Sequence, residues 1–152
     1  MIIVKGASSK LRLVTSAAGD IDVHASWVDL SGSTVTPDGL NPPAITTATT
    51  TDIVDAPGSG VSRAIKFLSI NNHHASIVNT VELYHTDGTD ENEIVRATLG
   101  PGEALIFTES VGFTRLNSAG TPVTAGNSGP SDVQVFTTVG ANTWTKPTAF
   151  SP

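Results

Sequence analysis

The residues of this chain that most readily suggest chemistry are its histidines and the acidic residues near one of them. They are His24, His73, His74, His85, Asp87 and Asp90. Imidazole and carboxylate groups are the zinc ligands that remain to a chain without cysteine. Their spacing argues against a metal site, because adjacent residues on a strand point to opposite faces and no two histidines lie two positions apart. We therefore expect structural or surface roles for the histidines and no bound metal.

Two of the histidines are expected in different environments. His85 shares a strand face with Val81 and Leu83, so we expect it to be buried and hydrogen-bonded. His24 lies opposite the apolar face of its strand, which predicts that it faces solvent or a contact with another subunit.

The acidic residues cluster in residues 87–93, with the sequence DGTDENE. A glycosidase holds two carboxylates about 5–10 Å apart in a cleft, whereas acids that follow one another in a turn are ordinarily solvated. Oxygen ligands at Asp87, Thr89 and Glu91 leave weak calcium binding open as an alternative, although the twelve-residue calcium loop is absent. Neither a Gly-x-Ser-x-Gly elbow nor a Gly-rich phosphate loop occurs. We expect a protein that is not an enzyme and binds no cofactor.

Composition and charge exclude several classes of partner. The chain has 8 Lys and Arg against 14 Asp and Glu, a net charge of −6, and so offers no basic surface for phosphates. The same sign disfavours anionic membranes, and no apolar run reaches the ~20 residues that span a bilayer. Residues 1–5 are too short for a secretory signal, so we expect a chain used as translated. We expect neither nucleic-acid nor membrane partners.

The fold must be built without helices or disulfides. The chain contains 21 Thr, 15 Ser, 14 Gly, 9 Pro and no Cys, and these residue types disfavour helix. Alternation of apolar and polar residues, typical of half-buried strands, recurs instead. Strands are predicted over residues 21–27, 44–54 (an edge strand), 64–70 (a central strand), 77–86, 93–99, 104–107 and 112–116. These short strands, separated by turns, predict an all-β antiparallel β-sandwich, resembling a jelly roll, without a helix longer than two turns in residues 10–120.

The same alternation predicts the core. The residues expected to be mostly buried are Ile21, Val23, Trp27, Ile65, Phe67, Val81, Leu83, Leu105, Phe107 and Phe113.

Four segments are predicted along the chain. Residues 1–13 are an N-terminal arm, 14–120 the β-sandwich, 121–132 a linker of small and turn-forming residues, and 133–152 a C-terminal strand and arm that starts a further domain or contacts a partner.

Several stretches resemble a known class of protein. Residues 99–107 (LGPGEALIF) followed by 112–120 (GFTRLNSAG) resemble small β-sandwich modules of tailed-bacteriophage virion proteins, as do HASWVD at 24–29, ITTATTT at 45–51 and LYHTDG at 83–88. Residues 135–137 (VFT) with 143–147 (TWTKP) are similar to the opening of glycine-rich distal domains of phage tail fibres and spikes. The glycine-rich continuation is missing here.

The resemblance implies a non-enzymatic structural protein located in the virion, specifically the virion-proximal base of a tail fibre or spike. A capsid decoration or head-fibre protein and a neck or collar protein are the alternatives within this class. A carbohydrate-binding adhesin domain that recognises a host-surface glycan is an alternative of another class, which the low aromatic content of 5% disfavours.

The expected partners are other virion proteins and further copies of this chain. Apolar residues at the two ends predict contacts between subunits, and the resemblance implies a trimer. The candidate interface residues are Ile2, Ile3, Val4, Val135, Phe136 and Trp144. Trp144 is expected to contribute most.

Overall fold

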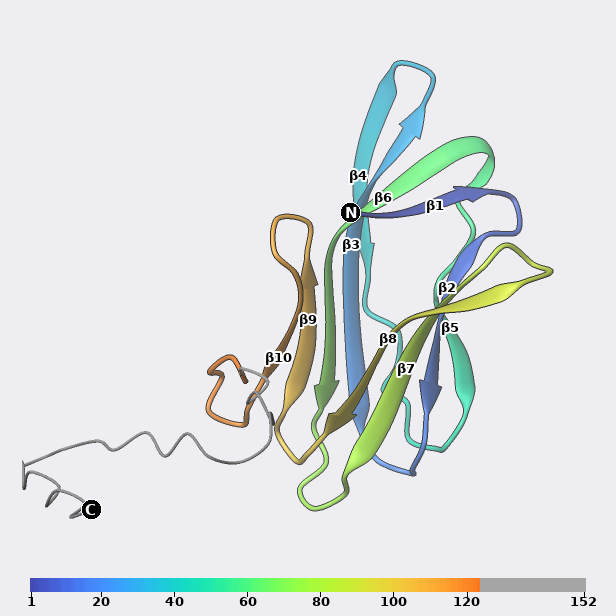
Figure 1. Cartoon of the computed structure of the whole chain (residues 1–152). Coiled ribbons are helices and arrows are strands. Elements are labelled where there is room, and N and C mark those ends of the chain that lie inside the picture. The colour runs from blue at the N-terminus through green and yellow to red at the C-terminus, as the bar shows by residue number, and fades with distance from the viewer. Residues whose placement is uncertain (124–152) are drawn as a thin grey trace, which may run out of the picture.

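In the part of the chain that the structure describes, ten strands form two antiparallel sheets that pack face to face (Figure 1). The computed structural model describes residues 1–123, and no helix occurs among them. The strands are β1 (Ile2–Gly6), β2 (Lys10–Thr15), β3 (Ile21–Ser31), β4 (Thr34–Leu40), β5 (Thr50–Val54), β6 (Gly58–Asn72), β7 (Asn79–Thr86), β8 (Glu91–Leu99), β9 (Ala104–Thr108) and β10 (Gly112–Leu116). The predicted antiparallel β-sandwich is confirmed.

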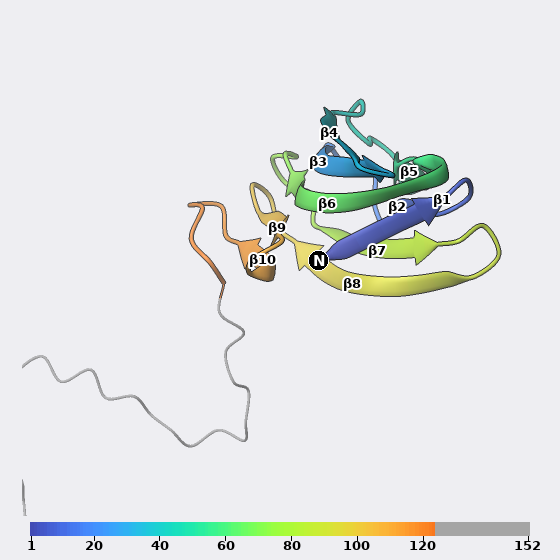
Figure 2. The same ribbon diagram turned by 90° about the horizontal axis from the view of Figure 1, so that it is seen from above.

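The first sheet has the strand order β10-β9-β6-β3-β4, and the second has the order β5-β2-β7-β8. Figure 2 shows the two layers from above. The fifteen-residue strand β6 is the centre of the first sheet. One side of β6 pairs with β3, and the other pairs with β1 along its first half and with β9 along its second half. The central strand predicted over residues 64–70 therefore lies within β6.

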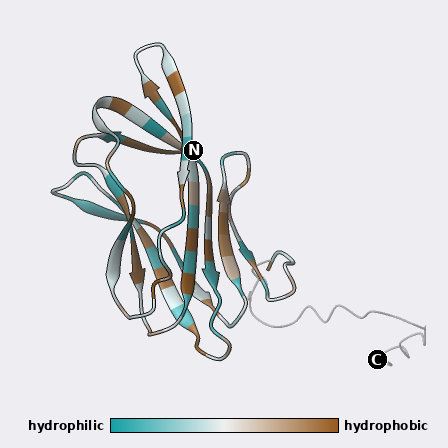
Figure 3. Cartoon of the chain, turned by 180° about the vertical axis from the view of Figure 1, so that it is seen from behind, coloured by the Kyte–Doolittle hydropathy of each residue, from teal (hydrophilic) through white to brown (hydrophobic). Residues whose placement is uncertain are grey.

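The core lies between the sheets and follows the period-two pattern. Along β3, Ile21, Val23, Ala25 and Trp27 are buried, and the residues between them face outward. Of the ten predicted core residues, Phe67 and Phe113 are half-buried and the other eight are buried. Figure 3 shows this alternation as hydrophobic and hydrophilic bands along the strands.

Residues 1–13 are part of the sandwich and not an arm. Strand β1 pairs with β6 over Ile2–Gly6, and β2 is an inner strand of the second sheet between β5 and β7. Leu11, Leu13 and Val4 have no exposed surface. The predicted boundary at residue 14 is therefore wrong: these apolar residues fill the core of their own chain, and the sandwich begins at Ile2.

A long hairpin formed by β3 and β4 projects beyond the body of the sandwich (Figure 1). All seven residues of β4 are exposed. The sequence gives no alternation there, and Pro37 and Gly39 interrupt the strand pattern, so β4 was not predicted. Its place at the sheet edge explains why proline is tolerated, because an edge strand has backbone groups that need no partner.

One side of the sandwich is closed by the connection between β4 and β5. Ile45 in this connection forms a β-bridge with Ile21 of the first sheet and is buried. The hydroxyl of Thr15, in the second sheet, donates to the carbonyl oxygen of Thr47 at 2.8 Å. The predicted edge strand over residues 44–54 is thus shorter than expected: β5 spans only Thr50–Val54 and lies at the edge of its sheet, while the preceding residues cross between the sheets.

After β10 the chain turns back along that strand. Pro122 forms an antiparallel bridge with Leu116, and the Val123 N–H donates to the Arg115 carbonyl oxygen at 2.8 Å. Residues 121–123 therefore extend the sandwich by a short edge segment. The rest of the predicted linker and the predicted C-terminal strand and arm, residues 133–152, lie outside the described residues.

Candidate functional site

The six candidate interface residues fall into two groups. Val4 is fully buried in the core of its own chain, and Ile2 is half-buried against that core. Ile3 points away from the core and is 46% exposed. Val135, Phe136 and Trp144 lie outside the described residues.

Ile3 belongs to a group of exposed apolar side chains at one end of the sandwich. We call this group the apolar end; it comprises Met1, Ile3, Leu30, Val35 and Val111. Leu30 and Val35 face each other across the β3–β4 hairpin, and Val35 is 62% exposed. Val111 lies at the tip of the β9–β10 hairpin, which Figure 1 places at the same end as the N-terminus.

The histidines are separated from one another and each has a local partner. His85 is half-buried, and its Nε2 lies 2.7 Å from the hydroxyl of Ser9. His24 faces outward from β3, with its Nδ1 2.6 Å from Oδ1 of Asn41. No group of three His, Cys, Asp or Glu side chains that could hold a metal ion occurs among residues 1–123.

The acidic turn is organised by its own backbone. The Asp87 carboxylate accepts the N–H groups of Asp90 and Thr89, both at 2.9 Å. These bonds lower the pKa of Asp87, with the bond from Asp90 contributing most. The carboxylate therefore acts as a turn-stabilising acceptor. Gly88 has a φ of 97°, which suits a tight turn at this position.

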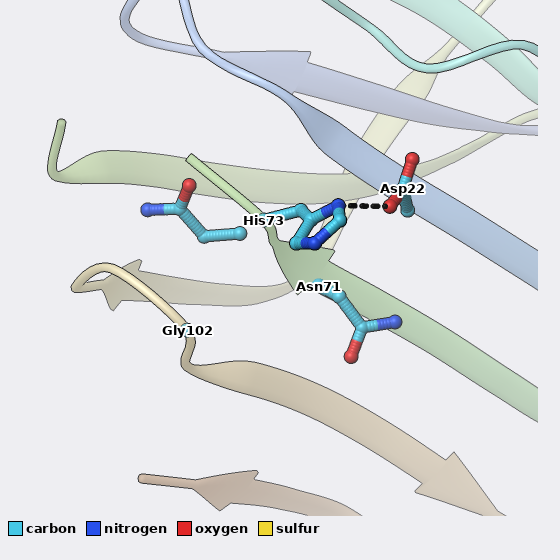
Figure 4. A pocket seen from close by; sticks show the side chains of 5 residues that line it. Asp22, Asn71, His73 and Gly102 are labelled. Carbon is cyan, nitrogen blue, oxygen red and sulfur yellow. Dashed lines mark ion pairs between the residues drawn. The ribbon is translucent and has the colours of Figure 1, made fainter. Parts of the chain in front are cut away.

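A small polar pocket of about 300 Å³ lies where β6 ends (Figure 4). Its lining residues are Asp22, Asn71, Asn72, His73 and Gly102. His73 points toward Asp22, and their Nδ1 and Oδ2 atoms are 3.3 Å apart. Both side chains are largely exposed. The pocket offers a carboxylate, an imidazole and amides to a polar ligand, and its lining residues include no Phe, Tyr or Trp.

A larger groove of about 450 Å³ lies between the edges of the two sheets. Strand β8 is the edge of one sheet and β10 the edge of the other. The lining residues are Val95, Arg96, Ala97, Thr98, Leu105, Phe113, Arg115 and Val123. Val95, Ala97 and Phe113 are half-buried and pack against the core. We call this feature the edge groove; the described part of the chain ends in it, at Val123.

The charged groups of the edge groove are paired at its rim. Arg96 contacts Glu82 and Glu93 at 3.1 and 2.7 Å. Arg115 donates from Nη2 to Glu103 at 2.6 Å, and the same carboxylate oxygen accepts the Gly100 N–H at 2.6 Å. The Nε atom of Arg115 is buried and has no hydrogen-bond partner among the described residues. One donor in this groove is therefore left without an acceptor.

Sequence reasoning did not identify the edge groove, although one signal was present. Arg115 follows Phe113 at a spacing of two, which places the guanidinium on the apolar face of β10. A charged residue on the apolar face of a strand indicates an unusual site.

Comparisons with known proteins give no relatives for this chain. No family model, no curated protein and no solved structure matches it. Within residues 1–123 there is also no helix long and apolar enough to cross a membrane.

Proposed function

We propose that this protein is a non-enzymatic structural protein of a tailed-phage virion and serves as the virion-proximal base of a tail fibre or spike. The resemblance of residues 99–120 and 135–147 to virion modules supports this proposal. A capsid decoration or head-fibre protein and a neck or collar protein are the alternatives within the same class.

The observation that carries the proposal is the position of the chain's contact surfaces. The apolar end lies at one end of the sandwich, at the tips of the β3–β4 and β9–β10 hairpins. The last described residues lie toward the other end, because Pro122 pairs with Leu116, and Leu116 pairs with Ala104 at the start of β9 (Figure 1). Such a module can attach through the apolar end and leave its other end for a second partner. Exposed apolar residues that gather at one place commonly mark a contact with another protein.

The test is to locate the chain in purified particles. Antibodies against residues 1–123 should label a fixed position on virions of the phage that encodes it: the tail tip for a fibre or spike, the capsid for a decoration protein, or the neck for a collar protein. Absence of the chain from gradient-purified particles would refute the whole class.

Substitution of the apolar end makes this test specific. Val35→Ser should reduce incorporation into particles while leaving the melting temperature unchanged, because the side chain is already in solvent. Val78→Ser is the matched control, since Val78 is 53% exposed but lies in the β6–β7 connection at the opposite end. Equal incorporation of both variants would show that the apolar end is not the attachment surface.

We further propose that the protein is a homotrimer in which at least one terminal segment, with Trp144 as its main residue, packs against a neighbouring subunit. Sedimentation of the wild-type chain and of Trp144→Ala tests this. The expected result is a trimer that the substitution weakens, because a desolvated tryptophan is among the strongest interface contributors. A wild-type monomer at high concentration would contradict self-association.

A carbohydrate-binding adhesin domain is the second candidate, and the polar pocket favours it. Asp22, Asn71 and His73 present acceptors and donors suited to sugar hydroxyls. Binding of the chain to a glycan array, lost in Asp22→Ala, would support this function. Turnover of a cell-surface polysaccharide would instead indicate an enzyme.

A further inference from the structure

The gap between the two sheets is covered to different extents on the two sides of the sandwich. On the side of β4 and β5, the connection between these strands crosses from sheet to sheet and places Ile45 in the core. On the side of β8 and β10, the described residues supply only Val123. The edge groove is therefore the counterpart of the gap that Ile45 fills, and it lacks an equivalent cover.

The side chains that line the edge groove alternate in a way that suits the addition of a β-strand. Val95 and Ala97 lie two positions apart on β8 and share its inward face, so they match apolar residues that also repeat every second position. Among residues 1–123, strand β8 pairs only with β7, and its other edge has backbone groups without a partner strand. Addition of a strand to such an edge supplies main-chain hydrogen bonds, while its alternate side chains fill the groove.

The chain beyond Val123 contains one segment with the matching pattern. Residues 133–136 (VQVF) carry Val133 and Val135 at a spacing of two, followed by Phe136. The rest of residues 124–152 has isolated apolar residues among Thr, Ser, Gly and Pro. Only Asp132 and Lys146 are charged in this stretch, so little charge opposes its burial.

The linker is long enough for this segment to reach the edge groove of its own chain. Nine residues, 124–132, separate Val123 from Val133. At about 3.3 Å per residue they span up to roughly 30 Å, whereas packed sheets are about 10 Å apart. Val123 already lies in the edge groove, so the segment needs only to cross from the β10 side to the β8 side.

We propose that residues 133–136 dock in the edge groove of the same chain as an additional strand on β8, with Val133 and Val135 facing Val95 and Ala97. This arrangement brings backbone carbonyl oxygens to the groove, where the Nε of Arg115 has no acceptor among residues 1–123. It places Phe136 on the outer face of the sheet, the side of Arg96.

Docking within one chain is favoured over docking between copies. A linker of only nine residues holds the segment at an effective concentration on the order of millimolar, which exceeds the concentration of other copies in dilute solution. The inference is independent of the proposed virion function. It leaves Trp144, eight residues beyond Phe136, available for a contact with another subunit.

Cysteine cross-linking tests the inference directly, because the chain contains no cysteine of its own. The variant with Ala97→Cys and Val135→Cys should form a disulfide within one chain. The matched control combines Val135→Cys with Thr98→Cys, since Thr98 is adjacent on β8 but exposed on the outer face. We expect cross-linking of the Ala97 pair to be at least about tenfold faster, because only that pair shares a face.

Three results would overturn the inference: equal rates for the two pairs, faster reaction of the Thr98 pair, or disulfides that form only between chains in proportion to concentration. The last result would identify a second copy as the occupant.

A second experiment measures hydrogen exchange in variants whose substitutions lie only in the C-terminal segment. In the full chain, Val135→Asp should increase hydrogen exchange about tenfold or more at those β8 amides between Val95 and Thr98 that point away from β7, because only these amides lose a partner strand. Val139→Asp, which lies beyond the docking segment, should leave exchange unchanged. Identical exchange in wild type and Val135→Asp would show that residues 133–136 do not cover β8.

Discussion

Replacement of Glu103 by glutamine tests whether one carboxylate holds together the β8–β9 turn and the last described strand. Its Oε2 accepts the Gly100 N–H and an Arg115 N–H, both at 2.6 Å. The turn between Gly100 and Glu103 has Pro101 at its second position and Gly102, with a φ of 74°, at its third, which is the pattern of a type II turn. The carboxylate thus joins β8, β9 and β10.

The expected loss of stability in Glu103→Gln follows from how far the two contacts of this carboxylate are buried. The side chain of Glu103 is 16% exposed, and that of Arg115 is 39% exposed. Glutamine can still accept the Gly100 N–H, but a neutral hydrogen bond is about half as strong as a charge-assisted one, a loss of about 1 kcal/mol. The partly exposed ion pair with Arg115 contributes up to about 1 kcal/mol. We expect Glu103→Gln to lower the free energy of unfolding by about 2 kcal/mol at pH 7.

The stability difference between the wild type and Glu103→Gln should become smaller at low pH. The hydrogen bond from Gly100, and after it the one from Arg115, lowers the pKa of Glu103. Its pKa in the unfolded chain is about 4.3. A depressed pKa in the folded state stabilises the protein fully above that value, and the stabilisation is lost as the pH falls through the lower folded-state pKa. The difference between wild type and Glu103→Gln should therefore narrow below about pH 4.

Urea unfolding followed by tryptophan fluorescence at pH 7 and pH 3 measures both quantities. Glu109→Gln is the matched control, because Glu109 pairs with Lys66 at 2.6 Å but both side chains are well exposed. The control should change stability much less. The reasoning would be refuted if Glu103→Gln had the same urea midpoint as the wild type at pH 7. It would also be refuted if the two proteins differed in stability as much at pH 3 as at pH 7.

Two further substitutions test the core and a buried amide. Asn72→Ala should lower the free energy of unfolding by about 2–3 kcal/mol, since the buried Asn72 amide donates to the carbonyl oxygens of Ile77 and Leu99 at 2.7 and 2.9 Å. A urea midpoint close to that of the wild type would show that water replaces the amide. Leu83→Ala should cost about 3 kcal/mol, because Leu83 is buried between the sheets; calorimetry should show a much smaller effect for the exposed Leu30→Ala, and equal effects would contradict the assigned core.

The sequence was sufficient to predict strands whose two faces meet different environments. Residues 21–27 alternate strictly because one face of β3 lies in the core and the other in solvent. Residues 64–70 lie in β6, the central strand of its sheet, where Ile65, Leu68 and Ile70 are buried while Lys66 is exposed. The turn at residues 100–103 falls between the predicted strands 93–99 and 104–107, where proline followed by glycine restricts the backbone.

Other elements could not be predicted because their structure depends on distant partners. Strand β4 has no buried face, and it exists as the edge partner of β3. Residues 1–13 were separated from the core by sequence distance alone, but antiparallel pairing brings Ile2 next to Ile65. Contacts of such high sequence separation are not encoded by local alternation.

The edge groove illustrates the same limit for a site. It forms where the end strands of two sheets meet, and the sequence pattern does not reveal strand order. The position of Arg115 on an apolar strand face was visible in the sequence, but its partner Glu103 lies twelve residues earlier, on the other side of a hairpin. Only the register of β9 and β10 brings these two side chains together.

The outer face of the second sheet is poorly suited to contact with a partner. Asp52 on this face accepts hydrogen bonds from Lys10 and Arg12. Burial raises the pKa of Asp52, but these two hydrogen bonds and the positive charges of Arg12 and Lys10 together lower the pKa below its ordinary value. Arg12 also pairs with Glu91.

A partner that covered this sheet would have to desolvate ion pairs that are already satisfied, and the cost of removing paired charges from water commonly exceeds the gain. The apolar end and the edge groove carry no such cost over most of their surface, because their side chains are chiefly apolar.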